Sequence, residues 1–269
     1  MTIHFDFSAK VILVTGGTKG VGRGIAEAFL QAGATVIVSG RNKPETLPSF
    51  GDNQAAFIAM DVRDSQQIES AIQQIKDRYE RLDVLINNAG GTPFALADDM
   101  SPRFSEKIVA LNLLGPLYCA QAANTLMQQQ ENGGSIINIA SVSGTRPSPG
   151  TAIYGAAKAG LLNLTQSLAV EWAPKVRVNA ITAGMILTEQ SHLHYGDEDG
   201  IAAVAATVPL GRLALPQDIA GICLYLASDA ASYLSGTSIT AHGAGERPAF
   251  LDAANVEQNL TDASVKKDT

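Results

Sequence analysis

The sequence predicts a single-domain, doubly wound α/β fold, and three observations lead to this prediction. Short strand-like runs alternate with longer segments of helical periodicity along most of the chain. The strand-like runs are apolar throughout, as in VILV and SIINI, which is typical of strands buried on both faces of a parallel sheet. No Pro- or Ser-rich linker divides the 269 residues, so one domain is expected.

The expected elements follow one another as strand and helix in turn. The runs VILV, TVIV, DVLI, SIINI and VRVNAI are short, apolar and rich in β-branched residues, so each is interpreted as a strand. The segments between most of them carry apolar residues at helical spacing. Strands are therefore expected at 11–15, 35–39, 55–60, 83–86, 135–139, 176–181 and 237–241, and helices at 21–32, 65–79, 101–129, 152–173 and 216–227.

Two segments fall outside this alternation. Residues 187–208 are polar, with acids at 197–199, and they follow a strand. Ligands of doubly wound sheets bind beyond the carboxyl ends of the strands, so we expect this segment to form a lid over the site. The domain is expected to span residues 1–245, with 246–269 as a frayed C-terminal tail.

Charge and composition exclude several classes of protein. The chain has 19 Lys and Arg against 26 Asp and Glu, a net charge of −7, and no basic run, so neither nucleic acid nor a membrane is expected as a partner. The uncharged stretch 108–130 contains Gly115 and Pro116 and is interpreted as a buried helix. No signal peptide is visible, which predicts a cytoplasmic protein, and Cys119 and Cys223 are expected to be buried thiols.

A glycine-rich turn, TGGTKGVG, occupies residues 15–22 directly after the first strand. Glycine lets the backbone turn tightly and approach a ligand, and the helix that follows presents its N-terminal amides to an anion. This pattern predicts a site for the pyrophosphate of a dinucleotide. A purely structural turn is the alternative interpretation.

The second strand ends at Gly40 and Arg41, where NAD-binding sheets place an acid against the ribose hydroxyls. With no carboxylate there, Arg41 and Lys19 are free to pair with the 2′-phosphate of NADP. We therefore expect NADP(H) to be preferred over NAD(H). The alternative is that both cations are solvated surface charges.

Tyr154 and Lys158 are four residues apart at the start of a predicted helix and so share one face of it. A neighbouring ammonium favours the phenolate, so Lys158 is expected to lower the pKa of Tyr154 and make it a proton donor and acceptor. Ser141 follows the strand at 135–139, and its hydroxyl can donate to a substrate carbonyl. A turn or capping role for Ser141, or for nearby Ser143, is the alternative.

Taken together, five motifs resemble those of the short-chain dehydrogenase/reductase family over about residues 8–243: TGGTKGVG, NNAG at 87–90, Asn112 in LNLLG, Ser141, and YGAAK at 154–158. The resemblance implies a Rossmann-type domain with a seven-stranded parallel sheet and a nicotinamide cofactor. It further implies hydride transfer between a carbonyl and a secondary alcohol, in a homotetramer or homodimer. Two positions depart from the family pattern, because Ala183 replaces its usual proline and His242 its usual aspartate.

The resemblance also implies roles for single residues. Tyr154 would be the general acid and base, Lys158 would lower its pKa and contact the nicotinamide ribose, and Ser141 would polarise the carbonyl. Asn112 would hold a water in a proton relay, and no metal site is implied. The expected cofactor contacts, besides Tyr154 and Lys158, are Gly16, Thr18, Lys19, Gly20, Val21, Gly22, Arg41, Asp61, Val62, Asn87, Asn88, Ala89, Gly90, Gly184, Ile186 and Thr188.

The substrate pocket is expected between residues 91–96, residues 142–149 and the lid. Most of the residues expected to line it are apolar, which predicts an apolar ketone or secondary alcohol as the small-molecule substrate; they are Gly91, Thr92, Pro93, Phe94, Leu96, Met185 and Leu187. Two alternatives stay open. The first is a 3-oxoacyl-[acyl-carrier-protein] reductase, disfavoured because residues 126–132 carry no cation although Lys175 and Arg177 remain; the second is a non-catalytic NADP-sensing module. His192 and His194 are interpreted as polar lid residues rather than metal ligands.

Overall fold

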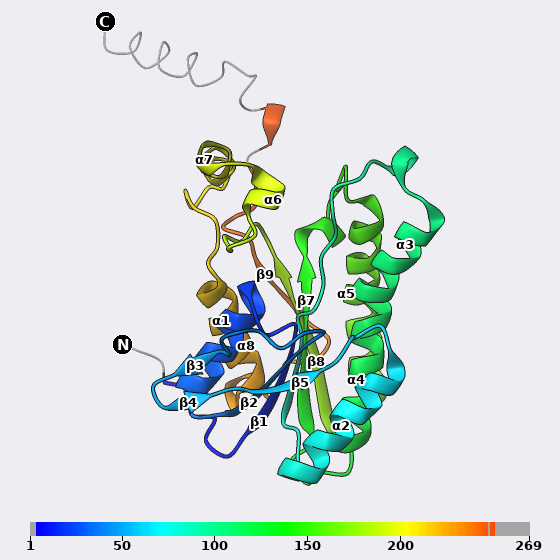
Figure 1. Ribbon diagram of the computed structural model, residues 1–269, viewed down its shortest axis with the longest axis vertical. Coiled ribbons are helices and arrows are strands. Elements are labelled where there is room, and N and C mark those ends of the chain that lie inside the picture. Colours follow the sequence, from blue (N-terminus) through cyan, green and yellow to red (C-terminus); the bar gives the residue numbers. More distant parts are fainter. Residues whose placement is uncertain (1–3, 247, 251–269) are drawn as a thin grey trace, which may run out of the picture.

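The computed structural model describes residues 4–246 and 248–250 and has three layers, with a parallel sheet between two layers of helices (Figure 1). The sheet has seven strands in the order β5-β2-β1-β6-β7-β8-β9. Every strand begins and ends within two residues of its predicted bounds, and the predicted doubly wound fold is confirmed. The strands are β1 (Val11–Thr15), β2 (Thr35–Gly40), β5 (Ala56–Ala59), β6 (Val84–Asn87), β7 (Gly134–Ser141), β8 (Val176–Ala183) and β9 (Ser238–Ala241).

Helices cover both faces of the sheet, each over its own apolar cluster. On one face lie α1 (Gly20–Gln31) and α8 (Pro216–Ala227), and on the other lie α2 (Ser65–Tyr79), α4 (Gly115–Met127) and α5 (Ala152–Trp172) (Figure 1). Phe29 of α1 is fully buried and meets the Phe7 ring edge to face at 5.0 Å. Burial of such a side chain contributes about 1.5–3 kcal/mol to folding, which is why the apolar strands occupy the centre.

The direction of the chain reverses between β1 and β6. From β1 the chain proceeds outward through β2 to β5, and then returns to place β6 on the other side of β1. At such a switch point the connections leave in opposite directions and open a crevice beyond the carboxyl ends of the strands. The fold therefore places the glycine-rich turn at the floor of a cleft.

A helix predicted at 101–129 is confirmed in extent, but it is not regular throughout. It consists of α3 (Pro102–Val109), a π-helical turn η2 (Ala110–Leu114) and α4. The π turn contains Asn112, which is fully buried. A π turn carries one extra residue, so it rotates the side chains that follow it relative to those before.

Several short elements were not predicted from the sequence. A small hairpin, β3 (Ser49–Phe50) and β4 (Asn53–Gln54), follows β2, and single turns form η1 (Ala97–Asp99), η3 (Val142–Gly144) and η4 (Asp229–Ala231). The lid, residues 187–208, contains α6 (His192–Tyr195) and α7 (Glu198–Ala206) and lies at the top of Figure 1. The tail predicted at 246–269 lies almost entirely outside the described residues.

The base of the lid is tied to the rest of the domain. Leu187 N donates to Ala214 O at 2.8 Å, and Ala214 N donates to Met185 O at 3.0 Å. Neither α6 nor α7 has a buried residue, so the lid rests on the domain through its ends rather than through a core of its own.

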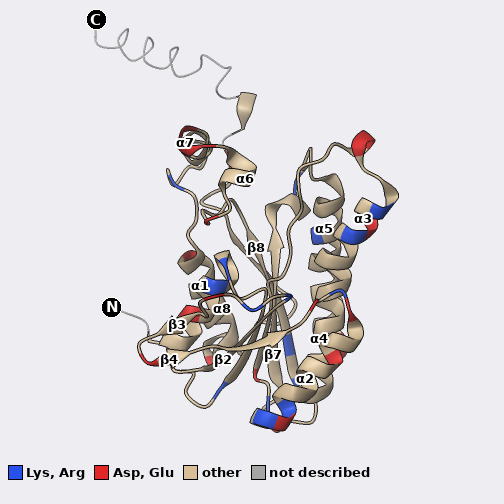
Figure 2. Cartoon of the chain, in the orientation of Figure 1, with Lys and Arg blue, Asp and Glu red and all other residues tan. Residues whose placement is uncertain are grey.

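Both cysteines are buried, as predicted, and burial raises the pKa of the Cys119 thiol to about 12. Basic and acidic residues are mixed along α2 rather than gathered by sign (Figure 2). Of the helices in the described part of the chain, none combines the length and the apolarity that a bilayer span requires.

Candidate active site

A cleft of about 680 Å³ opens over the carboxyl ends of the central strands. Segments far apart in the sequence meet in its wall, because parallel strands end at the same edge of the sheet. All the predicted cofactor contacts except Asn87 line it, together with Ser141. The lining comprises Gly16, Thr18, Lys19, Gly20, Val21, Gly22, Gly40, Arg41, Asn42, Met60, Asp61, Val62, Arg63, Asn88, Ala89, Gly90, Gly91, Leu111, Ile139, Ala140, Ser141, Tyr154, Lys158, Ala183, Gly184, Ile186, Thr188 and Gln190.

The glycine-rich turn fits the close approach of a dinucleotide. Gly16 and Gly20 have φ of +62° and +53°, where L side chains are strained. A Cβ on Gly22 would lie 2.4 Å from the Asn88 amide nitrogen, which donates to Thr15 O at 2.9 Å and Gly16 O at 3.2 Å. The turn therefore exposes bare backbone at the N-terminus of α1, where amide groups favour a phosphate.

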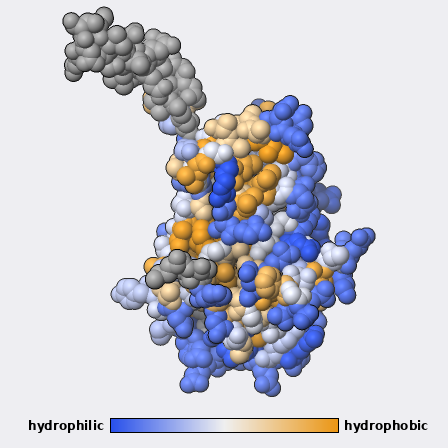
Figure 3. All heavy atoms as spheres, turned by 90° about the vertical axis from the view of Figure 1, so that its left-hand side faces the viewer, coloured by the Kyte–Doolittle hydropathy of each residue, from blue (hydrophilic) through white to orange (hydrophobic). Residues whose placement is uncertain are grey.

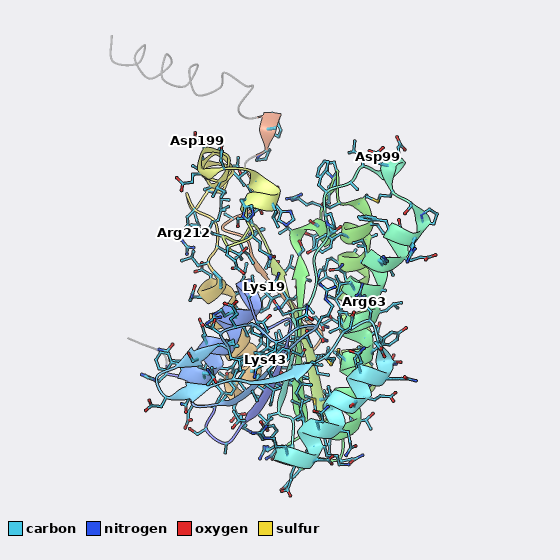
Figure 4. All side chains as sticks on the ribbon, in the orientation of Figure 1. Lys19, Lys43, Arg63, Asp99, Asp199 and Arg212 are labelled. Carbon is cyan, nitrogen blue, oxygen red and sulfur yellow. The ribbon has the colours of Figure 1, made fainter. Side chains whose placement is uncertain are left out.

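Cations gather at one end of the cleft. Lys19 caps the start of α1, and Arg41 follows β2; among the described residues, neither side chain forms an ion pair or a hydrogen bond. Arg63, labelled with Lys19 in Figure 4, pairs with Asp61 at 2.5 Å and holds the pKa of that carboxyl below its usual range. The two unpaired cations and the neutralised acid fit a phosphorylated ribose.

The end of β6 differs from expectation at one residue. Asn88, Ala89 and Gly90 line the cleft, but the Asn87 side chain does not. It is 2% exposed and donates to Pro116 O and to Asn138 Oδ1, so it belongs to the buried polar contacts under α4. Side chains alternate between the two faces of a strand, which separates neighbours in the NNAG motif.

Asn112 lies behind the wall of the cleft and supports it. Its Oδ1 accepts from Gly91 N at 2.9 Å, while its Nδ2 donates to Gly91 O at 2.9 Å and to Ile108 O at 3.0 Å. All of its side-chain hydrogen bonds thus go to main-chain groups. The structure gives this side chain a positioning role on the Gly90–Gly91 turn, and the proton-relay water stays a prediction.

Ser141 is the last residue of β7 and faces the cleft, whereas Ser143 is not part of the lining. The Ser141 hydroxyl also accepts a hydrogen bond from Ser143 N at 3.2 Å, which caps the η3 turn. The Ser141 side chain can therefore both cap a turn and face the cleft, the two roles considered from the sequence. Its O–H hydrogen is directed into the cleft, where it can be donated to the Tyr154 oxygen or to a substrate oxygen.

Tyr154 and Lys158 lie on the first turns of α5, at the inner end of the cleft. Lys158 is 4% exposed; its Nζ donates to Ile139 O at 2.7 Å and lies 5.6 Å from the centre of the Tyr154 ring. Burial lowers the pKa of Lys158 to about 8. Burial likewise raises the pKa of Tyr154, and the nearby Ser141 hydroxyl offsets only part of this increase.

The expectation that Lys158 lowers the pKa of Tyr154 therefore differs from the structure. The ammonium is directed at the Ile139 carbonyl and the ring face, and burial disfavours the charged form of both groups. Tyr154 is consequently a neutral phenol near pH 7, which is the form able to donate a proton.

Several of the lining residues were not predicted from the sequence. Met60 precedes Asp61 and Arg63 follows it by two positions, so the end of a predicted strand was an available signal for both. Leu111 reaches the cleft from the unpredicted π turn, and Gln190 from the lid. Among the described residues, no three His, Cys, Asp or Glu side chains cluster as metal ligands would.

Comparison with known proteins indicates the same family as these motifs. A family model described as enoyl-(acyl carrier protein) reductase matches residues 16–243. The chain is 35% identical over 243 residues to a probable 2,4-dienoyl-CoA reductase of Bacillus subtilis, a match that covers 87% of this chain and 95% of that protein. The chain belongs to the short-chain dehydrogenase/reductase family.

Further members of this family show the same extent of similarity. The sorbose reductase of Schizosaccharomyces pombe is 38% identical over 253 residues, which cover 90% of this chain and 98% of that one. The aldohexose dehydrogenase of Thermoplasma acidophilum, in ligand-free form, superposes with a TM-score of 0.82 at 30% identity, covering 88% and 94% of the two chains. This short-chain dehydrogenase/reductase is thus an oxidoreductase that acts on CH–OH and C=O groups with an NAD(P) cofactor.

Proposed function

We propose that this short-chain dehydrogenase/reductase interconverts an apolar ketone and its secondary alcohol with NADP(H). The observation that carries the cofactor preference is the pair of cations, Lys19 and Arg41, at the end of the cleft beyond β2. Gly40 leaves this end without the carboxylate that would bind the ribose hydroxyls of NAD and repel a 2′-phosphate. Both cations are available, since neither is paired with any described side chain.

The reaction assigns a task to each side chain at the inner end of the cleft. When bound, a nicotinamide supplies or accepts the hydride. Tyr154 gives its phenolic proton to the carbonyl oxygen during reduction and takes it back during oxidation. Ser141 donates a hydrogen bond to the same oxygen, and Lys158 supplies a buried positive charge beside the phenol as negative charge develops there.

The substrate preference rests on exposed apolar side chains of two segments, the loop after β6 and the lid, which lie outside the residues that line the cleft. Phe94 and Leu96 are 71% and 52% exposed on the loop after β6, and Leu193 of the lid is 67% exposed. Apolar side chains gather on the upper part of the face shown in Figure 3, where the lid lies. Exposed apolar walls around a few polar groups are typical of a site that binds an apolar small molecule.

Phe94 is held in place by the loop that follows Ser141. Gly150 has φ of +77°, and a Cβ there would lie 1.9 Å from the Phe94 ring, so the ring packs directly over a bare backbone. Ala95 N donates to Gly150 O at 2.8 Å and joins the two loops. The apolar wall is therefore fixed relative to the reacting side chains.

Docking of an acyl carrier protein is less well supported. Such a carrier is acidic and requires free cations, yet Lys175 Nζ donates to Gln128 O and Gln130 O, and Arg177 donates to Leu226 O and Leu234 O. Both residues that kept this alternative open are thus engaged in the fold. A carrier-bound substrate is the second candidate, because this chain is 35% and 33% identical to the 3-oxoacyl-[acyl-carrier-protein] reductases of Thermotoga maritima and Chlamydia pneumoniae.

We also propose a homotetramer formed through α4, α5 and β9. Val170 on α5 is 81% exposed in the single chain, and contact with a second copy would shield this apolar side chain from water. Light scattering checks this assembly, and a monomer would contradict it.

The test follows NADPH oxidation and NADH oxidation by absorbance with a panel of apolar ketones, steroids, sugars and acyl thioesters. We expect turnover of apolar ketones with NADPH, and loss of that turnover in Tyr154→Phe. Turnover of sugars alone would overturn the apolar substrate but keep hydride transfer. Binding of NADPH without turnover of any carbonyl would favour the NADP-sensing module instead.

A further inference from the structure

Glu189 of the lid contacts the glycine-rich turn. Gly20 N, the first amide of α1, donates to Glu189 Oε1 at 3.0 Å, although the two residues are 169 positions apart. The first amides of a helix have no partner within the helix and carry the positive end of its dipole. A carboxylate of the protein therefore binds at the end of α1 that forms part of the cleft.

The lid is shaped to hold this carboxylate in place. Thr188 N donates to Ser191 Oγ at 2.9 Å, and Ser191 Oγ donates to Ile186 O at 3.3 Å. Ser191 is 3% exposed, so this turn is a fixed part of the lid. A Cβ on Gly20 would touch Thr188 at 3.6 Å, and glycine at this position lets the lid come close.

We propose that Glu189 lowers the affinity for the cofactor and links the position of the lid to occupancy of the pyrophosphate site. This inference rests on the proposed function, because it requires a dinucleotide in the cleft. The carboxylate and a pyrophosphate carry the same sign and use the same helix terminus. Entry of the cofactor therefore weakens the contact between Gly20 and Glu189 at the start of the lid.

The size of the effect follows from the exposure of the contact. Glu189 and Gly20 form a solvent-exposed hydrogen bond, and a charge at an exposed helix terminus contributes about 0.3–1 kcal/mol. Glu189→Gln keeps an acceptor for Gly20 N but removes the charge. We expect this variant to bind NADPH about twofold to fivefold more tightly than the native chain, and the difference to shrink as salt is added.

The experiment is a fluorescence titration of the full chain with NADPH and with 2′-phosphoadenosine (2′-AMP). The second probe reaches the cationic end of the cleft but has no pyrophosphate. Glu198→Gln, another exposed lid acid, is the matched control and should bind both probes as the native chain does. Glu189→Gln should bind NADPH more tightly and 2′-AMP with unchanged Kd.

The outcomes separate this inference from the proposed function. If the native chain binds neither NADPH nor NADH, both fail. If it binds NADPH and Glu189→Gln has the same or a larger Kd, only the role of Glu189 is overturned. An equal gain for NADPH and 2′-AMP, or an equal gain in Glu198→Gln, would also overturn it, because the effect would then be one of net charge.

Hydrogen exchange of the lid gives a readout that does not depend on the ligand. Without ligand, amides of residues 186–191 should exchange at least threefold faster in Glu189→Gln than in the native chain, since the charged contact to Gly20 is lost. Unchanged exchange there would show that Glu189 does not hold the lid, and the proposed link would fail.

Discussion

The Asn112 side chain and the Gly91 main chain hydrogen-bond to each other in both directions. Gly91 N donates to Asn112 Oδ1, and Asn112 Nδ2 donates to Gly91 O, each at 2.9 Å. One fully buried amide thus fixes the turn that borders the inner end of the cleft.

Asn112→Leu should lower the free energy of unfolding by about 2–4 kcal/mol, because Leu has a similar branched shape but leaves Gly91 N, Gly91 O and Ile108 O without their partner. Urea denaturation measures this loss. Gln121→Leu, at an exposed position of α4, should change stability by less than about 0.5 kcal/mol. Equal effects of the two changes would show that the amide does not support the turn.

Arg41→Ala should weaken NADPH binding by about tenfold or more and leave NADH binding unchanged, since only NADPH carries the 2′-phosphate. Lys43→Ala removes a nearby cation that does not line the cleft and should affect neither cofactor (Figure 4). Titration of both cofactors against both variants checks this. Equal weakening of NADPH and NADH by Arg41→Ala would contradict the assigned 2′-phosphate site.

We expect the buried Lys158 side chain to make the stability of the protein depend on pH. Its pKa is about 8 in the folded chain and 10.5 when unperturbed, so between these values the unfolded chain binds more protons and the free energy of unfolding increases with pH. The full increase is about 3 kcal/mol. Lys158→Met should lack it, whereas Lys107→Met at an exposed position should keep it. Parallel curves for the native chain and Lys158→Met, measured by denaturation from pH 7 to 10, would contradict the burial cost.

Because Tyr154 exchanges the proton, we expect the rates of reduction and of oxidation to depend on pH in opposite ways. Because burial raises the pKa of the Tyr154 phenol above its usual value, the phenol is protonated at neutral pH. Reduction should be nearly constant from pH 6 to 7 and decrease above pH 8, where Lys158 loses its positive charge, while oxidation should increase with pH up to that range. The rate of Tyr154→Phe should be about 100-fold or more below that of the native chain in both directions of the reaction. Tyr79→Phe, on α2, should match the native rates. An oxidation rate that levels off below pH 8 would mean that another group takes the proton.

Gly150→Ala should raise KM for apolar ketones, because the added Cβ displaces the Phe94 ring. Gly51→Ala has the same kind of strained backbone, with φ of +55°, but open space around it, so it reports the cost of the backbone alone, about 1–2 kcal/mol. Steady-state kinetics of both variants, with NADPH binding as a check on the cofactor site, test this. Identical KM values would show that Phe94 does not contact the substrate.

The strands and the cleft residues next to them could be predicted because their signals are local. Apolar runs locate the strand ends, and the strand ends locate Ser141, Asp61 and the NNAG motif. The π turn at 110–114 could not be predicted, since ALNLL reads as ordinary helix and only the contact between Asn112 and Gly91 explains the extra residue.

Contacts between distant segments set the remaining features. Nothing near Glu189 in the sequence indicates Gly20, and nothing near Tyr154 indicates how far burial would raise its pKa. The lid reads as polar loop because its helices are short and bury no side chain. Asn87 and Asn88 are neighbours of the same type, and only the pleat of β6 assigns one to the core and the other to the cleft.

The hydrogen bonds that join Leu187 and Met185 to Ala214 have an evolutionary consequence. The chain leaves the domain and returns to it at one point, so the segment between can lengthen, shorten or be exchanged while its ends stay where they are. Doubling such a loop costs only about 0.6 kcal/mol in closure entropy. Relatives can therefore acquire new substrates by replacing this one insertion, with the distances among Ser141, Tyr154 and Lys158 inherited unchanged.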